Sequence, residues 1–185
     1  VTALYEKNTD PDPTPDPEPE KPWVNPFKDV AADAWYYDGV KFANQNELFN
    51  GTAADAFSPN MPMTRAMLVT VLWRLDGKPT ATAAVSFTDV AGGTWYTEAV
   101  AWAAGSGIVN GVGAGRFDPD GNVTREQIAA IIYRYAGFKG RPVDQKADLS
   151  GFPDLGSVGS WARDAFAWAN AAGLITGTRE NGVDY

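Results

Sequence analysis

Two arginines stand where a side chain of this type can bind an anion. Arg65 follows Thr64 and Arg125 follows Thr124, and each threonine is a predicted helix N-cap. The first turn of a helix offers free backbone N–H groups and the positive end of the helix dipole. A guanidinium there can pair bidentately with a carboxylate, each charge-assisted bond contributing about 1.5–3 kcal/mol. The alternative is a surface arginine that neutralises a nearby carboxylate of the protein.

The sequence around these arginines repeats with a constant shift of 60 residues, as from Phe27 to Phe87. The paired segments are Phe27–Val30 with Phe87–Val90, Trp35–Tyr36 with Trp95–Tyr96, Phe42–Ala43 with Trp102–Ala103, Asn50–Gly51 with Asn110–Gly111, Phe57–Pro59 with Phe117–Pro119, and Thr64–Arg65 with Thr124–Arg125. A third copy contains Phe152, Asp154, Trp161, Phe166, Trp168 and Thr176–Gly177. By the spacing of the first copy, Val183 takes the place of Phe57, so we expect this copy to end before its second helix.

Each copy is predicted to form a helix, a glycine-containing loop and a second helix. In the second copy, Thr94 is the expected N-cap of a helix that begins at Trp95 and ends at Gly105. The next helix starts at Thr124, where Gln127 completes a capping box. The apolar positions expected to be buried are Ile128, Ile131, Ile132 and Tyr135 before Gly137, and Leu68, Val71, Leu72 and Leu75 before Gly77. A unit of two helices cannot bury such a face alone, so the copies must pack together.

The composition excludes several classes of function. The 185 residues carry a net charge of −8, which argues against a nucleic acid as partner. The absence of His and Cys excludes histidine-dependent triads, thiol nucleophiles and zinc sites built from these residues. No stretch approaches the roughly 20 apolar residues of a membrane span, so we expect no membrane insertion. We expect no catalytic residue, cofactor or metal site.

The segment before the repeats has the composition of a spacer. Residues 10–22 read DPDPTPDPEPEKP, and alternating proline with acidic residues favours an extended polyproline II conformation. Val1–Tyr5 alternates like the last strand of a preceding β domain, although an unstructured terminus fits equally well. We therefore divide the chain into residues 1–22 (the end of a preceding domain plus linker), 23–79 (repeat 1), 80–140 (repeat 2) and 141–185 (repeat 3).

The repeated pattern resembles the S-layer homology (SLH) repeat. The resemblance rests on Phe-x-Asp-Val, Trp-Tyr, an aromatic-Ala helix, a glycine-rich loop ending in Phe-x-Pro, and Thr-Arg at the second helix. It extends from Asn25 to the C-terminus. The family commonly has Thr-Arg-Ala-Glu, whereas this chain has Met67 and Gln127 at the fourth position, a change expected to weaken the helix cap more than binding.

The resemblance implies a mainly helical, all-α fold in which three repeats form a pseudo-threefold spindle with ligand grooves between neighbours. It also implies non-covalent binding, at the bacterial cell surface, to a secondary wall polysaccharide attached to peptidoglycan and often carrying pyruvyl ketals. By this analogy Arg65 and Arg125 contact the ketal carboxylate. Further candidates for the ligand site are Trp35, Trp95, Trp161, Asp29, Asp89, Asp154, Gly51 and Gly111.

Each candidate also has a simpler interpretation. The aspartates can cap turns, and the tryptophans can be buried in the core, as we expect for Trp102 and Trp168 at core spacing. The main alternative function is a structural module of a surface lattice that associates with copies of itself. An enzymatic function is disfavoured. A glycosidase needs two carboxyl groups on either side of a sugar-sized cleft, and we do not expect repeats this small to form such a cleft alone.

Overall fold

The computed structural model describes residues 22–82, 84, 86–177, 179–180 and 183–184. The predictions for the segment before residue 22 lie outside these residues. The helices are α1 (Tyr37–Gln45), α2 (Arg65–Leu75), α3 (Thr97–Gly105), α4 (Arg125–Phe138) and α5 (Arg163–Ala171), with a 3₁₀ turn η1 at Leu155–Ser157. Two short antiparallel strands, β1 (Arg179–Glu180) and β2 (Val183–Asp184), follow α5. The prediction of a mainly helical protein is confirmed.

The second helix of each complete repeat starts as predicted. Thr64 is the N-cap of α2 and accepts a hydrogen bond from the N–H of Met67. Thr124 caps α4 in the same way, and Gln127 completes the capping box. These side chains satisfy N–H groups that have no partner within the helix.

Other predicted helix ends were wrong. Thr94 does not cap α3, which begins at Thr97 with Tyr96 as N-cap, because the Thr94 hydroxyl bonds to Thr97 and to the carbonyl of Ala91. Trp95 therefore precedes the helix. Helix α4 runs past Gly137 to Phe138. The left-handed residue that follows the helix is Gly140, with a positive φ, because glycine adopts that conformation without steric cost.

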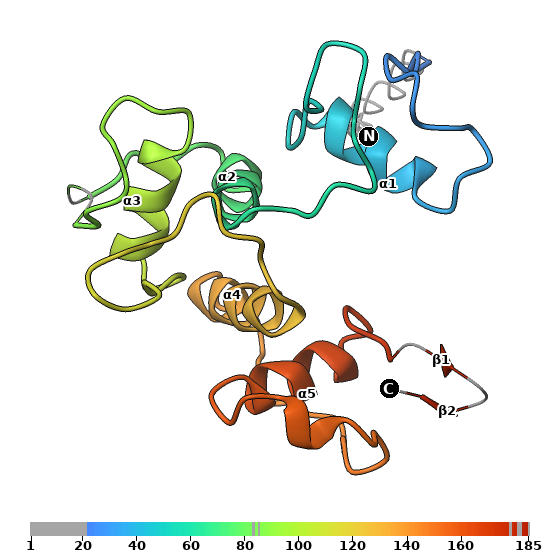
Figure 1. Cartoon of the computed structure of the whole chain (residues 1–185), viewed down its shortest axis with the longest axis vertical. Coiled ribbons are helices and arrows are strands. Elements are labelled where there is room, and N and C mark those ends of the chain that lie inside the picture. The colour runs from blue at the N-terminus through green and yellow to red at the C-terminus, as the bar shows by residue number, and fades with distance from the viewer. Residues whose placement is uncertain (1–21, 83, 85, 178, 181–182, 185) are drawn as a thin grey trace, which may run out of the picture.

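The helices pack across repeat boundaries. Helix α2 of repeat 1 contacts α3 of repeat 2, and α4 of repeat 2 contacts α5 of repeat 3 (Figure 1). Helix α4 lies between two buried clusters, so its predicted stripe is divided: Ile131 faces the α2–α3 cluster and Ile132 faces α5. The expected sharing of apolar surface between repeats is thus present, but it joins the second helix of one repeat to the first helix of the next.

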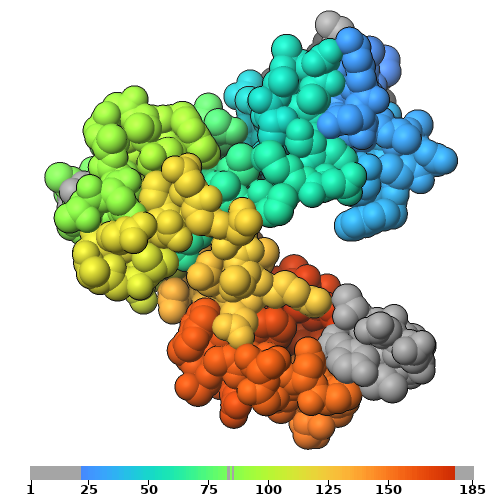
Figure 2. Space-filling model, viewed as in Figure 1, coloured from blue at the N-terminus to red at the C-terminus, as the bar shows by residue number. Residues whose placement is uncertain are grey.

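Burial agrees only in part with the predicted stripes: Leu68, Leu72 and Ile131 are buried, whereas Val71, Ile128, Ile132 and Tyr135 are half-buried. Trp102 and Trp168 are buried, as expected from their spacing. Leu75 is 50% exposed, however, because α2 turns Val69 and Leu72 toward α3 instead. Helix α1 lies apart, with a small core formed by Phe27, Val30 and Val40. The space-filling view shows a curved row of lobes in chain order (Figure 2). The pseudo-threefold arrangement stays a prediction.

Among the residues described, no helix combines the length and apolar character needed to cross a membrane.

Candidate functional site

Two grooves of similar size lie at equivalent positions of repeats 1 and 2. Groove A has a volume of about 420 Å³ and is lined by Phe49, Asn50, Gly51, Thr52, Met61, Met67, Thr70, Arg74 and Trp95. Groove B has a volume of about 450 Å³ and is lined by Arg65, Asn110, Gly111, Val112, Gln127, Ala130, Ile131, Arg134 and Trp161. Their volumes are large enough for a sugar-sized ligand rather than a single ion.

Each groove is built from more than one repeat. The loop and second helix of a repeat form two walls, and the exposed tryptophan of the next repeat forms another. Trp95 therefore belongs to groove A, with Gly51, and Trp161 belongs to groove B, with Gly111 and Arg65. Both indoles are 57% exposed, which leaves them accessible to a ligand. The sequence identified these residues but not which of them would meet.

The two loop glycines are required by close packing. A Cβ on Gly51 would lie 2.5 Å from the Ala56 carbonyl oxygen and 2.7 Å from the Phe27 ring. A Cβ on Gly111 would lie 2.5 Å from the Arg116 carbonyl oxygen. Any larger residue would therefore displace the loop that forms the groove wall.

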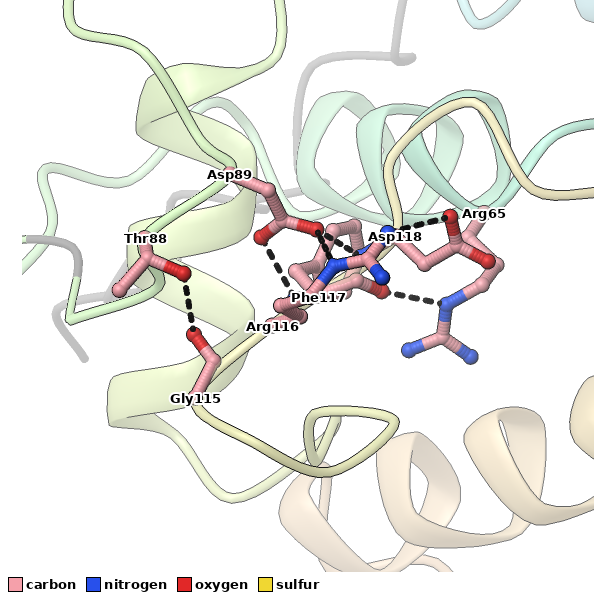
Figure 3. A network of polar contacts seen from close by, with 7 residues as sticks. All are labelled: Arg65, Thr88, Asp89, Gly115, Arg116, Phe117 and Asp118. Carbon is pink, nitrogen blue, oxygen red and sulfur yellow. Dashed lines mark hydrogen bonds and ion pairs between the residues drawn. The ribbon is translucent and has the colours of Figure 1, made fainter.

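Asp29 and Asp89 accept hydrogen bonds from backbone N–H groups of the loops that contain Gly51 and Gly111. The two carboxylate oxygens of Asp89 accept hydrogen bonds from the N–H groups of Phe117 and Asp118, at 2.8 Å each (Figure 3). Asp29 does the same for Phe57 and Ser58. Neither aspartate lines groove A or groove B, so their position supports the turn-forming interpretation.

These bonds shift the acidity of both aspartates. The N–H groups of Phe57 and then Ser58 lower the pKa of Asp29 below its ordinary value. For Asp89, burial acts to raise the pKa, but the two N–H groups and the Arg116 side chain outweigh it and the pKa is lowered. Both carboxylates are consequently ionised at neutral pH, which is the form that accepts two hydrogen bonds.

Arg65 is embedded in the contact between repeats 1 and 2. Its side chain is buried, and its Nε–H donates to the Phe117 carbonyl at 2.8 Å (Figure 3). Its Nη2 donates to the Asn110 carbonyl at 3.1 Å. The guanidinium also lies over the Phe117 ring, 4.7 Å from its centroid. Burial lowers the pKa of Arg65, against the opposing effect of Asp118 and Asp89.

The start of α2 does not have the free N–H groups that the sequence led us to expect. The N–H of Arg65 donates to the Gly121 carbonyl and that of Ala66 donates to the Pro119 carbonyl, both in the turn of repeat 2. That turn therefore occupies the anion-binding end of the helix. This part of the prediction is wrong for α2, because the next repeat supplies the acceptors.

Arg65 nevertheless has donors left for a ligand. A guanidinium has five N–H donors, and two of them are used here, which leaves three (5 − 2) without a hydrogen-bond partner among the described residues. No carboxylate oxygen of the described part of the chain lies within 4.0 Å of Arg65. Arg65 is thus a buried cation that lines groove B and forms no ion pair with a described carboxylate.

Arg125 of repeat 2 makes a similar contact with the third copy. Its Nη2 donates to the Thr176 carbonyl at 2.8 Å, which corresponds to the bond between Arg65 and Asn110. Arg125 is exposed and lines a smaller, mainly apolar pocket of about 190 Å³ together with Phe152 and Asp154. Arg179 lies in β1 and does not begin a helix.

Trp35 is the candidate with the least structural support. Its side chain is 93% exposed, packs edge-on against Tyr36 and lines neither groove A nor groove B.

Comparison with known families decides the identity of the repeats. The model of the S-layer homology domain matches residues 26–66, 86–129 and 151–182, which together make up more than half of the chain. The chain belongs to the S-layer homology family. The three matches begin within a few residues of Phe27, Phe87 and Phe152, so the repeats read from the sequence are those of the family.

Relatives of this SLH chain include surface-layer proteins and polysaccharide-degrading enzymes. It is 32% identical over 159 residues to the surface-layer 125 kDa protein of Lysinibacillus sphaericus, which covers 86% of this chain and 13% of the relative. It is 30% identical over 155 residues to an endoglucanase of Bacillus sp. (strain KSM-635), covering 84% of this chain and 16% of the relative. It is 31% identical over 113 residues to the S-layer protein sap of Bacillus anthracis, covering 57% of this chain and 13% of the relative.

The SLH chain thus spans less than a fifth of the length of these relatives. Family membership, together with the surface-layer relatives, indicates the extracellular cell surface and supports a role in attaching surface proteins to the cell wall. The region shared with the endoglucanase covers only 16% of that protein.

The sequence did not single out two further arginines of the SLH repeats. Arg74 on α2 lines groove A and Arg134 on α4 lines groove B. They are related by the same shift of 60 residues (134 − 74) as the other paired positions. The available signal was their helical spacing, since Gln127, Ala130 and Arg134 fall on one face of α4.

Proposed function

We propose that this chain anchors a surface protein non-covalently to the bacterial cell wall by binding an anionic, pyruvylated secondary polysaccharide attached to peptidoglycan. The observation that carries this proposal is the composition of groove B, where Arg65, Gly111 and Trp161 come together from three repeats. We further propose that the chain catalyses no reaction and contacts neither nucleic acid nor the membrane interior.

The chemistry of the groove suits a ketal-bearing sugar. A pyruvyl ketal adds one carboxylate to a sugar ring, and the free donors of a guanidinium can pair with both of its oxygens. The exposed face of Trp161 can pack against the apolar face of the ring, and the polar loop at Asn110 can bond to hydroxyl groups. The burial of Arg65 strengthens such a contact, because charges interact more strongly where water is excluded.

The test is a sedimentation assay on purified wall sacculi that carry a pyruvylated polymer. We expect the chain to co-sediment with intact sacculi and to be released when mild acid has removed the ketals, since the carboxylate is then lost. Retention on both kinds of sacculi would contradict the anionic ligand. Sedimentation without sacculi would instead favour the alternative of a self-associating lattice module.

A pair of variants separates binding from folding in the same assay. Arg125→Ala removes an exposed guanidinium that makes one hydrogen bond, so the variant should fold while its retention on the wall falls. Trp102→Phe changes a side chain that is 4% exposed, so it should lower stability and leave retention nearly unchanged. Equal retention of two well-folded variants would rule out a contribution of Arg125 to the contact with the carboxylate.

A further inference from the structure

Groove B differs from groove A in its positive charge. Two guanidinium groups line groove B, Arg65 from α2 and Arg134 from α4, and no Asp or Glu among the described residues lines it. In groove A, Arg74 is the arginine among the lining residues. The chain has a net charge of −8, so two cations that line one groove stand out against the rest of the molecule.

Arg134 has no partner in the described part of the protein. The side chain of its counterpart Arg74 donates from Nη1 to the Leu48 carbonyl at 3.1 Å, but the Arg134 side chain makes neither a hydrogen bond nor an ion pair with any described residue. Among the described residues, five other cations form ion pairs with carboxylates, namely Lys28, Lys78, Arg116, Lys139 and Lys146. The Arg134 guanidinium is therefore available to a ligand with all of its donors.

One face of α4, which includes Arg134, lines groove B. Gln127, Ala130, Ile131 and Arg134 have the spacing i, i+3, i+4 and i+7, which places them along one face of α4. In groove A the positions of Gln127 and Ala130 are occupied by Met67 and Thr70. Groove B thus has a glutamine in place of a methionine and an alanine in place of a threonine, and with Arg65 it is the more cationic of the two.

The Arg65 side chain is less free than that of Arg134 to change its conformation when a ligand binds. Its Nε and Nη2 are held by two backbone carbonyls and its plane is fixed over Phe117. It can set the charge and shape of the groove, but it cannot move without breaking the contact between repeats 1 and 2. A second guanidinium in the same groove that no described residue holds, Arg134 on α4, can instead adjust to an anionic group.

We propose that Arg134 is a specificity-determining residue of groove B that binds the anionic substituent of the sugar together with Arg65, so that groove B selects charged sugar units and groove A does not. This rests on the proposed function in its choice of a polysaccharide ligand. The chemistry recognised is an oxyanion, either a ketal carboxylate or a phosphate.

The experiment follows ligand binding in each groove separately, with Trp161 as the reporter for groove B and Trp95 as the reporter for groove A. Indole N–H signals in ¹H–¹⁵N spectra of the whole chain are assigned with Trp161→Phe for groove B and Trp95→Phe for groove A. Three probes are titrated: a methyl hexoside with a pyruvyl ketal, the same hexoside without the ketal, and a hexose phosphate. The variants are Arg134→Gln, the conservative Arg134→Lys and the matched Arg74→Gln.

The wild-type protein should show the ketal hexoside shifting the Trp161 signal at lower concentration than the plain hexoside. Arg134→Gln should lower the affinity for the ketal hexoside, as followed by the Trp161 signal, by at least about tenfold, because one charge-assisted contact is lost. Its affinity for the plain hexoside should not change. Arg134→Lys should recover part of the loss and Arg74→Gln should have no effect at Trp161. The melting temperature of Arg134→Gln should equal that of the wild type, because no described protein group depends on the side chain.

The outcomes separate this inference from the proposed function. If the wild type prefers the ketal and Arg134→Gln keeps that preference, the role of Arg134 is overturned and wall anchoring stands. If the wild type binds only the phosphate and loses it in Arg134→Gln, Arg134 is an oxyanion contact and the pyruvylated ligand is wrong. If the wild type distinguishes none of the probes, both proposals fail.

Discussion

At the scale of single residues, the aspartate of each complete repeat stabilises the loop that forms a groove wall. Asp89 accepts hydrogen bonds from two consecutive N–H groups, those of Phe117 and Asp118. Phe117 is completely buried and its carbonyl accepts from Arg65, so the same short segment connects the turn to the neighbouring repeat. A residue that does not line the groove can therefore decide its shape.

The first prediction concerns Asp89→Ala. The variant should lose about 1–3 kcal/mol of unfolding free energy at pH 7, because two N–H groups lose their acceptor. The pKa of Asp89 is lowered on folding, so its contribution is present above the ordinary value of 3.8 and is lost as pH falls through the lower folded value. Urea unfolding at pH 7 and pH 3 measures both effects, and the difference from wild type should shrink at pH 3.

Asp154→Ala is the control for this experiment. The Asp154 carboxylate accepts no hydrogen bond from the described residues, and in the third copy the counterpart of the Phe117 segment lies at the end of the chain. Its removal should change stability much less. A loss as large as that of Asp89→Ala would contradict the explanation by two N–H groups.

At the scale of elements, α4 is the helix on which the arrangement depends. It contacts α5, contributes Ile131 to the α2–α3 cluster, and presents Arg134 to groove B. The contact with α5 consists largely of alanines around Trp168, which lets the two helix backbones approach closely. Its start is fixed by the capping box at Thr124.

The second prediction is that Thr124→Ala lowers the free energy of unfolding by about 1 kcal/mol, because the N–H of Gln127 loses its acceptor. Thr124→Ser keeps the hydroxyl and should be close to wild type. Chemical denaturation followed by circular dichroism measures the difference. Equal stability of the Ala and Ser variants would show that the cap contributes nothing.

At the scale of the whole molecule, the buried residues are unevenly distributed. The cluster shared by α2, α3 and α4 is large, whereas α1 rests on a small separate cluster that includes Phe27 and Val40. Local stability follows the amount of apolar surface buried around a segment. The lobe that contains α1 should therefore open more readily than the rest of the chain.

The third prediction compares two equivalent amides by hydrogen exchange. Val40 and Val100 occupy the same position in repeats 1 and 2, and each N–H donates to a tyrosine carbonyl at 2.9 Å. The Val40 amide should exchange faster than that of Val100, because its helix lies on the smaller core. Equal protection of the two amides would mean that the lobes open as one cooperative unit.

The sequence by itself determined the equivalence of residues. The shift of 60 residues, the caps at Thr64 and Thr124 and the buried positions of Trp102 and Trp168 follow from local rules, namely repetition, capping chemistry and helical periodicity. Those rules act over a few residues, and the structure agrees with them there. They place the candidate residues on their elements, but they do not state which copies touch.

The tertiary structure decided which residues of different repeats contact one another. Arg65 meets carbonyl oxygens 45 and 52 residues away, and Trp161 shares a groove with Gly111 of the preceding repeat. These contacts arise because the second helix of each repeat packs on the first helix of the next, which no local pattern encodes. The same packing buried Arg65, left Trp35 outside both grooves, and placed the Arg134 side chain in groove B without a partner among the described residues.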